Sequence, residues 1–242
     1  MKKTVGIIGG LGPLAGAYFY RRLIEKTPVK GDEGHLPVRI WSSPDLPSRL
    51  DHMRGTGPSP VPALVHIAKG LMESGAESLV IPSSTTHHYY RDIAQAVRPT
   101  PVINLLEEVA LAIVKTSVRS VGILATTPTV EFDLYQGVFQ KYGITGHYPD
   151  PGSQEEVMAE IMDVKAGRST SDRAERLIDI TQRPWMAPCE GLVLACTEIP
   201  VVFSHERWAR IDSRALFDAT DILVEATIRM SHGDPDTKGD TP

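Results

Sequence analysis

The sequence predicts an α/β protein of two pseudo-symmetric lobes, each a mostly parallel sheet flanked by helices, with the active site in the cleft between them. Short apolar runs alternate with amphipathic helical patterns along the 242 residues. This alternation is typical of parallel sheets that are covered on both faces. Segments of the first half recur in the same order in the second half. Polar residues also follow the expected strands directly, where α/β sheets bind ligands.

The first half alternates regularly between strands and helices. Pro13 suits the first turn of a helix, because its missing N–H needs no partner there. Gly75 suits a helix end, because glycine readily adopts a left-handed conformation. We expect strands at 4–8, 38–41, 78–81 and 102–104, and helices at 14–26, 62–74 and 88–97.

The second half continues the alternation. Its apolar runs are short, as expected of strands that are buried in a parallel sheet. The closing stretch SHGDPDTKGDTP, residues 231–242, has the composition of a disordered tail. We expect strands at 121–125, 144–148 and 192–195, and helices at 106–115, 130–142, 154–166, 171–182 and 213–230.

An internal repeat supports the division into lobes. VGIIGGLGPLA resembles VGILATTPTV, which starts 116 residues later, and LVIPSSTTH resembles LVLACTEIP, which starts 113 residues later. Nearly equal offsets indicate two lobes of the same topology, residues 1–103 plus 207–230 and residues 104–206. The repeat places Ser83 and Cys196 at equivalent positions, so we expect them to face each other across a bound substrate.

Composition and charge exclude several classes of function. The formal net charge is −5, and no cluster of lysine and arginine provides a footprint for phosphates, so we expect no nucleic-acid partner. No apolar stretch reaches the roughly 18 residues of a membrane span. The start MKKTVGIIGG is interrupted by glycines too early for an export signal. We therefore expect a cytoplasmic protein with no membrane partner.

The chain has two cysteines, Cys189 and Cys196. If the chain between them is a strand, they lie roughly 23 Å apart at about 3.3 Å per residue, whereas a disulfide needs Cα atoms within about 7 Å. Their spacing is not that of a metal site, and no histidine or carboxylate cluster supplies further ligands. We expect neither a disulfide nor a bound metal, and we interpret Cys189 as a buried, inert thiol.

The motifs together resemble those of the aspartate/glutamate racemase family. IGGLGPLAGAYF is similar to the family's N-terminal glycine loop, and IPSSTTH resembles its first catalytic motif, usually Pro-Cys-Asn-Thr-Ala-His. LACTEIP matches its second motif, Gly-Cys-Thr-Glu. SPDLPSR, ATTPT and EIMDVKAG stand where the family keeps its remaining pocket segments. The resemblance covers nearly the whole chain except the tail.

The resemblance implies an amino-acid racemase that uses neither pyridoxal phosphate nor a metal. Family members move the α-proton with two cysteines on opposite faces of the substrate's α-carbon, and they commonly form homodimers. Cys196 matches the second cysteine, whereas Ser83 stands in place of the first and Ser84 in place of the usual asparagine. Thr85 and His87 match the family motif. The implied substrate is aspartate or glutamate.

The serine makes the expected chemistry asymmetric. A free thiol has a pKa of about 8.5, which a site can lower into the range of a useful base, whereas an alcohol ionises far less readily. Some family members carry threonine at this position and still racemise. By resemblance, we expect Cys196 to remove the proton of the L enantiomer. Ser83 would donate a proton to the carbanion, or relay one from water or His87.

Two cations are candidates for binding the substrate. By resemblance, Arg49 and Lys165 align with residues that bind substrate carboxylates. A guanidinium can hold a carboxylate with two hydrogen bonds. The alternatives are an ion pair of Arg49 with Asp45 or Asp51, and stabilisation of a helix end by Lys165.

Hydroxyl groups are candidates for stabilising the enediolate that forms when the α-proton leaves. Preorganised donors of this kind stabilise developing negative charge, although hydroxyls after strands also cap helices. Glu198 and His87 are candidate acid/base or orienting groups, with an exposed position beside His88 as the alternative for His87. The hydroxyl candidates are Ser84, Thr85, Thr127, Thr129 and Thr197.

Three other functions compete with the racemase. GLGPLA fits a dinucleotide-binding pattern after a strand, but no acidic residue directly follows Trp41 to bind a ribose, and Pro13 lacks an N–H for a phosphate. The nearer alternatives are a one-cysteine decarboxylase or isomerase of a small dicarboxylate, and a non-catalytic amino-acid-binding relative. Exchange of the α-hydrogen in D₂O separates them, since a lyase releases CO₂ and a binding protein exchanges nothing.

Overall fold

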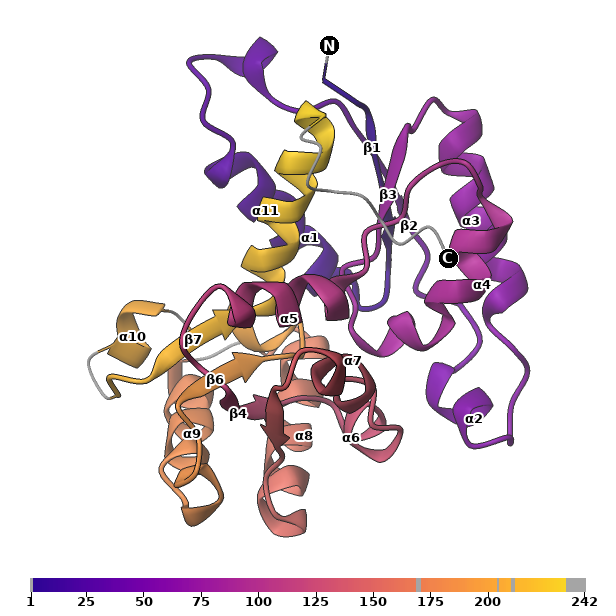
Figure 1. Cartoon of the computed structure of the whole chain (residues 1–242). Coiled ribbons are helices and arrows are strands. Elements are labelled where there is room, and N and C mark those ends of the chain that lie inside the picture. Colours follow the sequence, from indigo (N-terminus) through magenta and orange to yellow (C-terminus); the bar gives the residue numbers. More distant parts are fainter. Residues whose placement is uncertain (1, 169–170, 204, 210–211, 234–242) are drawn as a thin grey trace. The chain divides into compact units, whose positions relative to one another are not determined.

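The structure, a computed structural model, describes residues 2–168, 171–203, 205–209 and 212–233. The chain forms two compact units, Met1–Leu105 with Leu223–Pro242 and Leu106–Ile222. Each unit contains a parallel sheet and helices. Figure 1 shows the strands of the first sheet in indigo to purple and those of the second in magenta to orange. This is the α/β class with two lobes that the sequence predicts.

The first unit has a sheet of strand order β2-β1-β3, in which neighbouring strands are parallel. The central strand β1 (Val5–Gly9) is buried along its length, whereas the edge strand β2 (Val38–Ser42) is largely exposed. The remaining elements that begin in this unit are β3 (Ser78–Val80), α1 (Pro13–Lys26), η1 (Asp32–Gly34), α2 (Arg49–Met53), α3 (Val61–Glu73), η2 (Thr85–Tyr89), α4 (Tyr90–Ala96) and the first residue of α5 (Leu105–Val114).

The second unit has a sheet of strand order β5-β4-β6-β7, again with parallel neighbours. Its strands are β4 (Ser120–Leu124), β5 (Thr145–His147), β6 (Gly191–Leu194) and β7 (Ala215–Asp218). Its helical elements are α6 (Thr127–Glu131), α7 (Gln136–Lys141), α8 (Pro151–Lys165), α9 (Ser171–Thr181), η3 (Pro184–Met186), η4 (Ile199–Val201) and α10 (His205–Ala209), and α11 (Ala219–His232) begins here and continues into the first unit.

The two sheets share a topology. β1 lies between β2 and β3, and β4 lies between β5 and β6. The registers correspond as well, since Val5 pairs with Ser78 and Val121 pairs with Gly191, and the repeated sequences align these same positions. The internal repeat therefore reflects a shared arrangement of three strands, to which the second unit adds β7.

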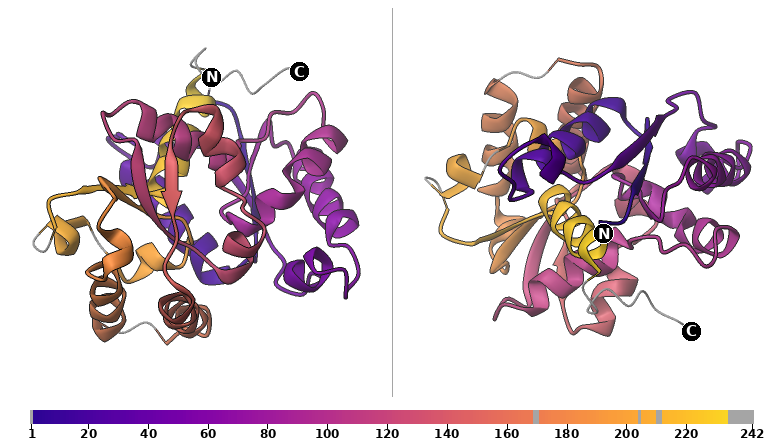
Figure 2. Two further views of the ribbon diagram at one scale, coloured as in Figure 1. Left: turned by 60° about the horizontal axis from the view of Figure 1, so that its bottom comes forward. Right: turned by 90° about the horizontal axis from the view of Figure 1, so that it is seen from above.

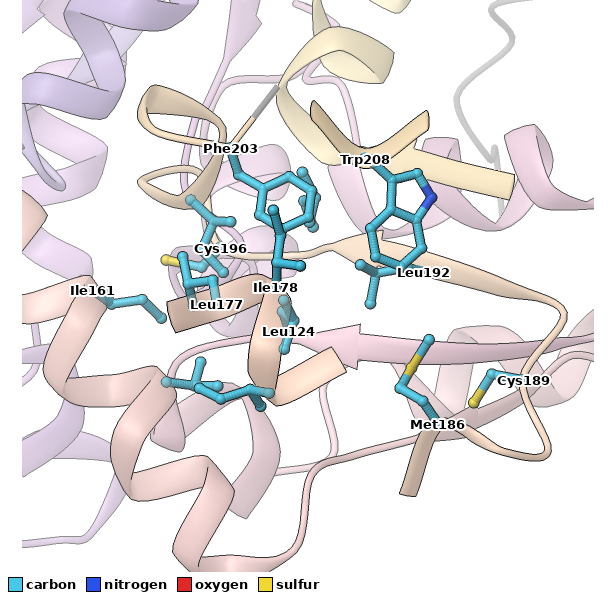
Figure 3. Close-up of a cluster of buried hydrophobic side chains, with 14 residues drawn as sticks. Leu124, Ile161, Leu177, Ile178, Met186, Cys189, Leu192, Cys196, Phe203 and Trp208 are labelled. Carbon is cyan, nitrogen blue, oxygen red and sulfur yellow. The ribbon is translucent and has the colours of Figure 1, made fainter. Parts of the chain in front are cut away.

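Buried apolar side chains stabilise each unit separately. Leu124, Leu192 and Trp208 belong to a cluster in the second unit, which Figure 3 shows at close range. Ile81 and Leu79 belong to a cluster in the first unit. Burying one such leucine or isoleucine side chain contributes about 1.5–3 kcal/mol. These clusters hold the strands whose carboxyl ends carry the candidate catalytic residues.

The C-terminal helix α11 is tied to the start of β1. The Lys3 N–H donates to the Ser231 carbonyl at 2.9 Å, and the Ser231 hydroxyl donates to the Lys3 carbonyl at 2.8 Å. Figure 2 shows this helix in yellow beside the N-terminus.

Among the described residues, no helix has both the length and the apolar character that crossing a membrane requires.

The expected helix at 213–230 is wrong in its first part. Ala215–Asp218 pairs with β6 as strand β7, and the helix begins only at Ala219. The Asp218 carboxylate accepts the N–H groups of Thr220 and Asp221, and so ends the strand and starts the helix. As a result, the part of 207–230 that precedes residue 223 falls in the second unit instead of the first.

Smaller differences concern helix ends. The expected helix at 130–142 is divided into α6 and α7, and Asp133 between them has a left-handed φ of 48°. The strand at 102–104 is reduced to a bridge between Val102 and Leu79. α11 continues through His232, inside the expected tail, and residues 234–242 of that tail lie outside the described part of the chain.

Gly10, directly after β1, requires glycine for two physical reasons. Its φ is 90°, and a Cβ there would lie 2.4 Å from the Ser43 carbonyl carbon. We expect Gly10→Ala to lower the thermal unfolding midpoint, because the left-handed conformation costs about 1–2 kcal/mol and overpacking costs about 1–3 kcal/mol more. Gly75→Ala is the matched control, since φ is 97° but no atom lies within 4 Å. Equal shifts in the two variants would contradict the contact with Ser43.

Candidate active site

Polar side chains gather just beyond the carboxyl ends of β3 and β6. The serine cluster, in the first unit, consists of Arg49, Ser83, Thr86 and His87. The cysteine cluster, in the second unit, consists of Lys165, Cys196 and Glu198.

Ser83 lies in a tight turn between β3 and η2. Its N–H donates to the Ile81 carbonyl at 2.8 Å, and the side chain is 4% exposed. The Thr86 hydroxyl donates to the Ser83 hydroxyl oxygen at 2.8 Å. Arg49 in turn donates from Nη1 to the Thr86 hydroxyl at 3.2 Å and to the Leu11 carbonyl at 3.0 Å. The serine is therefore connected through Thr86 to a permanent cation.

His87 fixes the backbone of Ser83. Its Nε2 accepts the Leu105 N–H at 3.0 Å, so the ring hydrogen is on Nδ1, which donates to the Ser83 carbonyl at 2.8 Å. Burial lowers the pKa of His87 and outweighs its backbone hydrogen bonds, which act in the opposite direction. The ring is buried, neutral and oriented, which supports the orienting role and contradicts the exposed alternative.

The two hydroxyl residues that follow Ser83 differ in their surroundings. Ser84 is buried and occupies the N-cap position of η2, where its side chain makes no capping hydrogen bond. Thr85, the first residue of η2, is half-buried. Capping of η2 is therefore not the role of the Ser84 hydroxyl.

Cys196 donates its thiol hydrogen to a carboxylate. Sγ lies 3.1 Å from Oε2 of Glu198, and Lys165 Nζ donates to the other oxygen, Oε1, at 2.5 Å. The cysteine and glutamate are buried, and the lysine side chain is 24% exposed. Figure 3 shows the sulfur directed away from Leu192 and Trp208, at the border of the apolar cluster. Lys165 is thus an ion-pair partner of Glu198 at the end of α8, which sequence reasoning did not anticipate.

The surroundings of Cys196 oppose ionisation of its thiol. Burial raises its pKa most, the negative charge of Glu198 raises it further, and the positive charge of Lys165 lowers it. At neutral pH the thiol therefore keeps its proton and points it at Glu198. Transfer of that proton to Oε2 would produce a thiolate without adding net charge to the cluster, so this geometry suits a base that is activated by its neighbour.

Hydroxyl groups also lie beyond β4, the neighbour of β6. The Thr126 and Thr129 hydroxyls are 3.0 Å apart, and Gln154 Nε2 donates to the Ala125 carbonyl at 3.0 Å and to Thr127 Oγ1 at 3.4 Å. Oε1 of Gln154 is buried without a hydrogen-bond partner among the described residues. Thr126, at the N-cap position of α6, makes no capping bond through its side chain.

Sequence reasoning missed three polar residues beyond the strand ends, namely Thr86, Thr126 and Gln154. Thr197, a candidate donor to the enediolate, is buried. Gln154 lies in the first turn of α8 without a motif around it. Thr86 could have been considered from the sequence, since it is the last of four consecutive hydroxyl residues that begin at Ser83.

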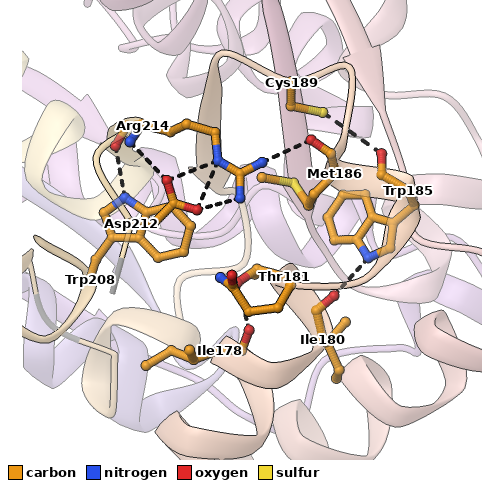
Figure 4. A network of polar contacts seen from close by, with 10 residues as sticks. Ile178, Ile180, Thr181, Trp185, Met186, Cys189, Trp208, Asp212 and Arg214 are labelled. Atoms are coloured by element: carbon orange, nitrogen blue, oxygen red, sulfur yellow. Dashed lines mark hydrogen bonds and ion pairs between the residues drawn. The ribbon is translucent and has the colours of Figure 1, made fainter. Parts of the chain in front are cut away.

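Cys189 has the character of a structural thiol. It is free and buried, and burial raises its pKa to about 11, although Arg214 acts in the opposite direction. Figure 4 shows its Sγ near the Trp185 carbonyl, at 3.9 Å, beside the bond from Arg214 Nη1 to the Met186 carbonyl at 2.8 Å. Cys196 is free as well, so the expected absence of a disulfide is confirmed.

Comparison with known proteins identifies one matching family, and the match includes residues of both units. The sequence profile of the family described as Asp/Glu/Hydantoin racemase matches residues 8–227. The broad specificity amino-acid racemase RacX of Bacillus subtilis is 25% identical over 237 residues, which cover 93% of this chain and 96% of that protein.

Two solved structures also resemble this chain along nearly its whole length. The aspartate racemase of Picrophilus torridus has a TM-score of 0.84 and 27% identity, with 95% of this chain and 94% of that chain covered. An aspartate racemase homologue from Pyrococcus horikoshii has a TM-score of 0.76 and 25% identity, with coverages of 96% and 100%. The likeness therefore extends through both units.

Proposed function

Because the chain belongs to the Asp/Glu/hydantoin racemase family and is an isomerase of the amino-acid racemase type, we propose that it racemises aspartate or glutamate with its own side chains, without a cofactor. Cys196 and Ser83 act on opposite faces of one α-carbon. The observation that carries this proposal is the contact of the Cys196 thiol with Glu198, which is itself paired with Lys165. That contact supplies a way to form a thiolate inside a buried site.

The proposed reaction begins with a proton transfer from Cys196 to Glu198. The thiolate then forms an S–H bond with the α-hydrogen of the L enantiomer, and the electrons of the broken C–H bond move into the substrate carboxylate as an enediolate. Ser83 gives its hydroxyl proton to the opposite face of the α-carbon and is left as an alkoxide. Glu198 releases its proton to water, and the alkoxide recovers one from water, so that the enzyme returns to its starting state.

Substrate binding is proposed for Arg49 and for the hydroxyl groups at the strand ends. Nη1 of Arg49 has two hydrogens, and it donates to the Leu11 carbonyl and to Thr86. The Arg49 guanidinium is proposed to bind a substrate carboxylate in the two-bond geometry that such groups favour. Ser84, Thr85, Thr127, Thr129 and Thr197 are the proposed donors to the enediolate.

The alternatives are separable by experiment. Family membership does not support the dinucleotide-binding interpretation of the glycine loop. We expect chiral chromatography, after incubation with each enantiomer of aspartate and of glutamate, to show the opposite enantiomer, and NMR in D₂O to show α-hydrogen exchange. Release of CO₂ would indicate a decarboxylase. Thermal stabilisation by the amino acids without exchange would indicate a binding protein, and either result would contradict the proposal.

Ser83→Cys tests the asymmetry of the two faces. The equilibrium constant of a racemisation is one, so kcat/KM must be equal in both directions, and the asymmetry appears in hydrogen exchange instead. We expect the wild type to exchange the α-hydrogen of the L enantiomer faster than it inverts it, because Ser83 is the weaker proton-transfer group. Ser83→Cys should bring inversion closer to exchange. An unchanged ratio would count against Ser83 as the second group.

We also propose a cytoplasmic homodimer. Family resemblance is the support for this assembly, and light scattering would then give twice the 26.5 kDa mass of one chain. The mass of a single chain at catalytic concentrations would contradict it.

A further inference from the structure

We propose that Thr86 is a positioning residue for Ser83. The hydrogen bonds that run from Arg49 through Thr86 to Ser83 set the direction of the Ser83 hydroxyl and stabilise the alkoxide that remains after proton donation. This inference rests on the proposed function, in which Ser83 is the proton donor, and it adds a residue and a physical cause for that role.

The direction of the first hydrogen bond decides which hydrogen remains for the substrate. Each hydroxyl has one hydrogen to donate. Thr86 uses its hydrogen on the Ser83 oxygen, at 2.8 Å. The hydrogen of Ser83 is therefore not used in this bond. Both side chains are buried, Thr86 at 0% and Ser83 at 4% exposure, so water does not compete freely for the same positions.

The positive charge of Arg49, at the start of this series of hydrogen bonds, polarises the Thr86 hydroxyl. Arg49 remains charged at all working pH values and donates to the Thr86 oxygen at 3.2 Å. A hydroxyl that accepts from a cation becomes a stronger donor, because consecutive hydrogen bonds polarise one another. Thr86 is thereby prepared to stabilise negative charge on the Ser83 oxygen. This is the charge that develops when Ser83 gives its proton to a carbanion.

The local backbone makes this arrangement rigid. Thr86 belongs to η2, and Ser83 lies in the turn just before it, where its N–H donates to the Ile81 carbonyl at 2.8 Å. The Ser83 carbonyl is held by His87 at 2.8 Å, and the carbonyl of Leu11 holds Nη1 of Arg49 at 3.0 Å. Arg49 and Ser83, the two ends of this series of hydrogen bonds, are thus each held by a hydrogen bond that involves a backbone carbonyl. Transition-state stabilisation requires this kind of preorganisation.

Thr86→Val tests the inference, because valine keeps the shape and removes the hydroxyl. Loss of one preorganised donor to a developing oxyanion lowers kcat by about 10²–10³-fold, so we expect inversion to fall by about that factor. Exchange of the L enantiomer's α-hydrogen should continue near the wild-type rate, since it needs Cys196 only. Thr86→Ser should restore most of the inversion. A structural role alone would lower inversion and exchange together, and that outcome would overturn the proposal.

Two further variants complete the test. Thr227→Val removes another buried hydroxyl of the same unit, which donates to the Leu223 carbonyl at 2.7 Å, and it should leave both rates unchanged.

In the Ser83→Cys background, Thr86→Val should reduce inversion by less than about tenfold, because a thiol ionises more readily than an alcohol. An equal loss in both backgrounds would overturn the role of Thr86. A wild type without α-hydrogen exchange would overturn the proposed function, and this inference with it.

Discussion

Cys196→Ala is expected to abolish both inversion and α-hydrogen exchange for the L enantiomer. In the proposed reaction the thiolate of Cys196 removes the proton, and no other described group in the cysteine cluster is a thiol. A positioned acid or base contributes about 10²–10⁴-fold to a rate. The loss should reach at least that range, since alanine leaves no thiolate to accept the α-proton.

Cys189→Ala is the matched control, because it removes the other thiol of the same unit. Cys189 is packed among the residues of Figure 4, and its pKa of about 11 keeps it protonated at neutral pH. We expect this variant to retain the wild-type rates of inversion and exchange. Exchange that persists in Cys196→Ala, or that disappears in Cys189→Ala, would place the base elsewhere.

The buried strands β1, β4 and β6, and the polar residues that follow them, could be predicted from the sequence. A strand that is buried on both faces must be apolar along its length, so β1, β4 and β6 are visible as short runs. β7 was missed because Ala215-Leu216-Phe217-Asp218 contains no β-branched residue and its pairing with β6 is not local. The same four residues are compatible with a helix, and only Asp218 marked the boundary through its capping role.

The contacts within each cluster depend on the folded chain. Lys165 and Glu198 are 33 positions apart, so no local pattern indicates their ion pair. Arg49 and Thr86 are 37 positions apart and meet only because β2 and β3 lie on either side of β1. Motif resemblance identified residue types and positions. The direction of each hydrogen bond, which determines the chemistry, required the structure.

Glu198→Gln is expected to make the Cys196 thiol more acidic and the enzyme slower. The negative charge of Glu198 raises the pKa of Cys196, so its removal should lower that pKa. Turnover should nevertheless fall by about 10²–10⁴-fold, because glutamine cannot accept the thiol proton as a base. Titration of the ultraviolet absorbance of the thiolate, in a Cys189→Ala background, measures the pKa, and chiral chromatography measures turnover.

Lys165→Met should move the same thiol pKa in the opposite direction. The positive charge of Lys165 lowers the pKa of Cys196, so the variant should ionise at higher pH, and the pH at which turnover rises should increase with it. Lys165→Arg keeps the positive charge, so the pKa of its Cys196 thiol should stay closer to the wild-type value. Lys141→Met is the matched control, since Lys141 also lies in the last turn of a helix and pairs with Glu107, at 3.8 Å.

Glu198→Gln shows whether Glu198 accepts the thiol proton as a base or only packs against Cys196. If Glu198 only packs against Cys196, then Glu198→Gln lowers the thiol pKa and turnover at neutral pH rises, because more thiolate is present. If Glu198 accepts the proton, turnover falls although the thiol is more acidic. Glu156→Gln, which removes a surface carboxylate paired with Arg183 at 2.7 Å, should change neither quantity. Faster turnover in Glu198→Gln would therefore exclude the proton transfer that the cysteine cluster is proposed to perform.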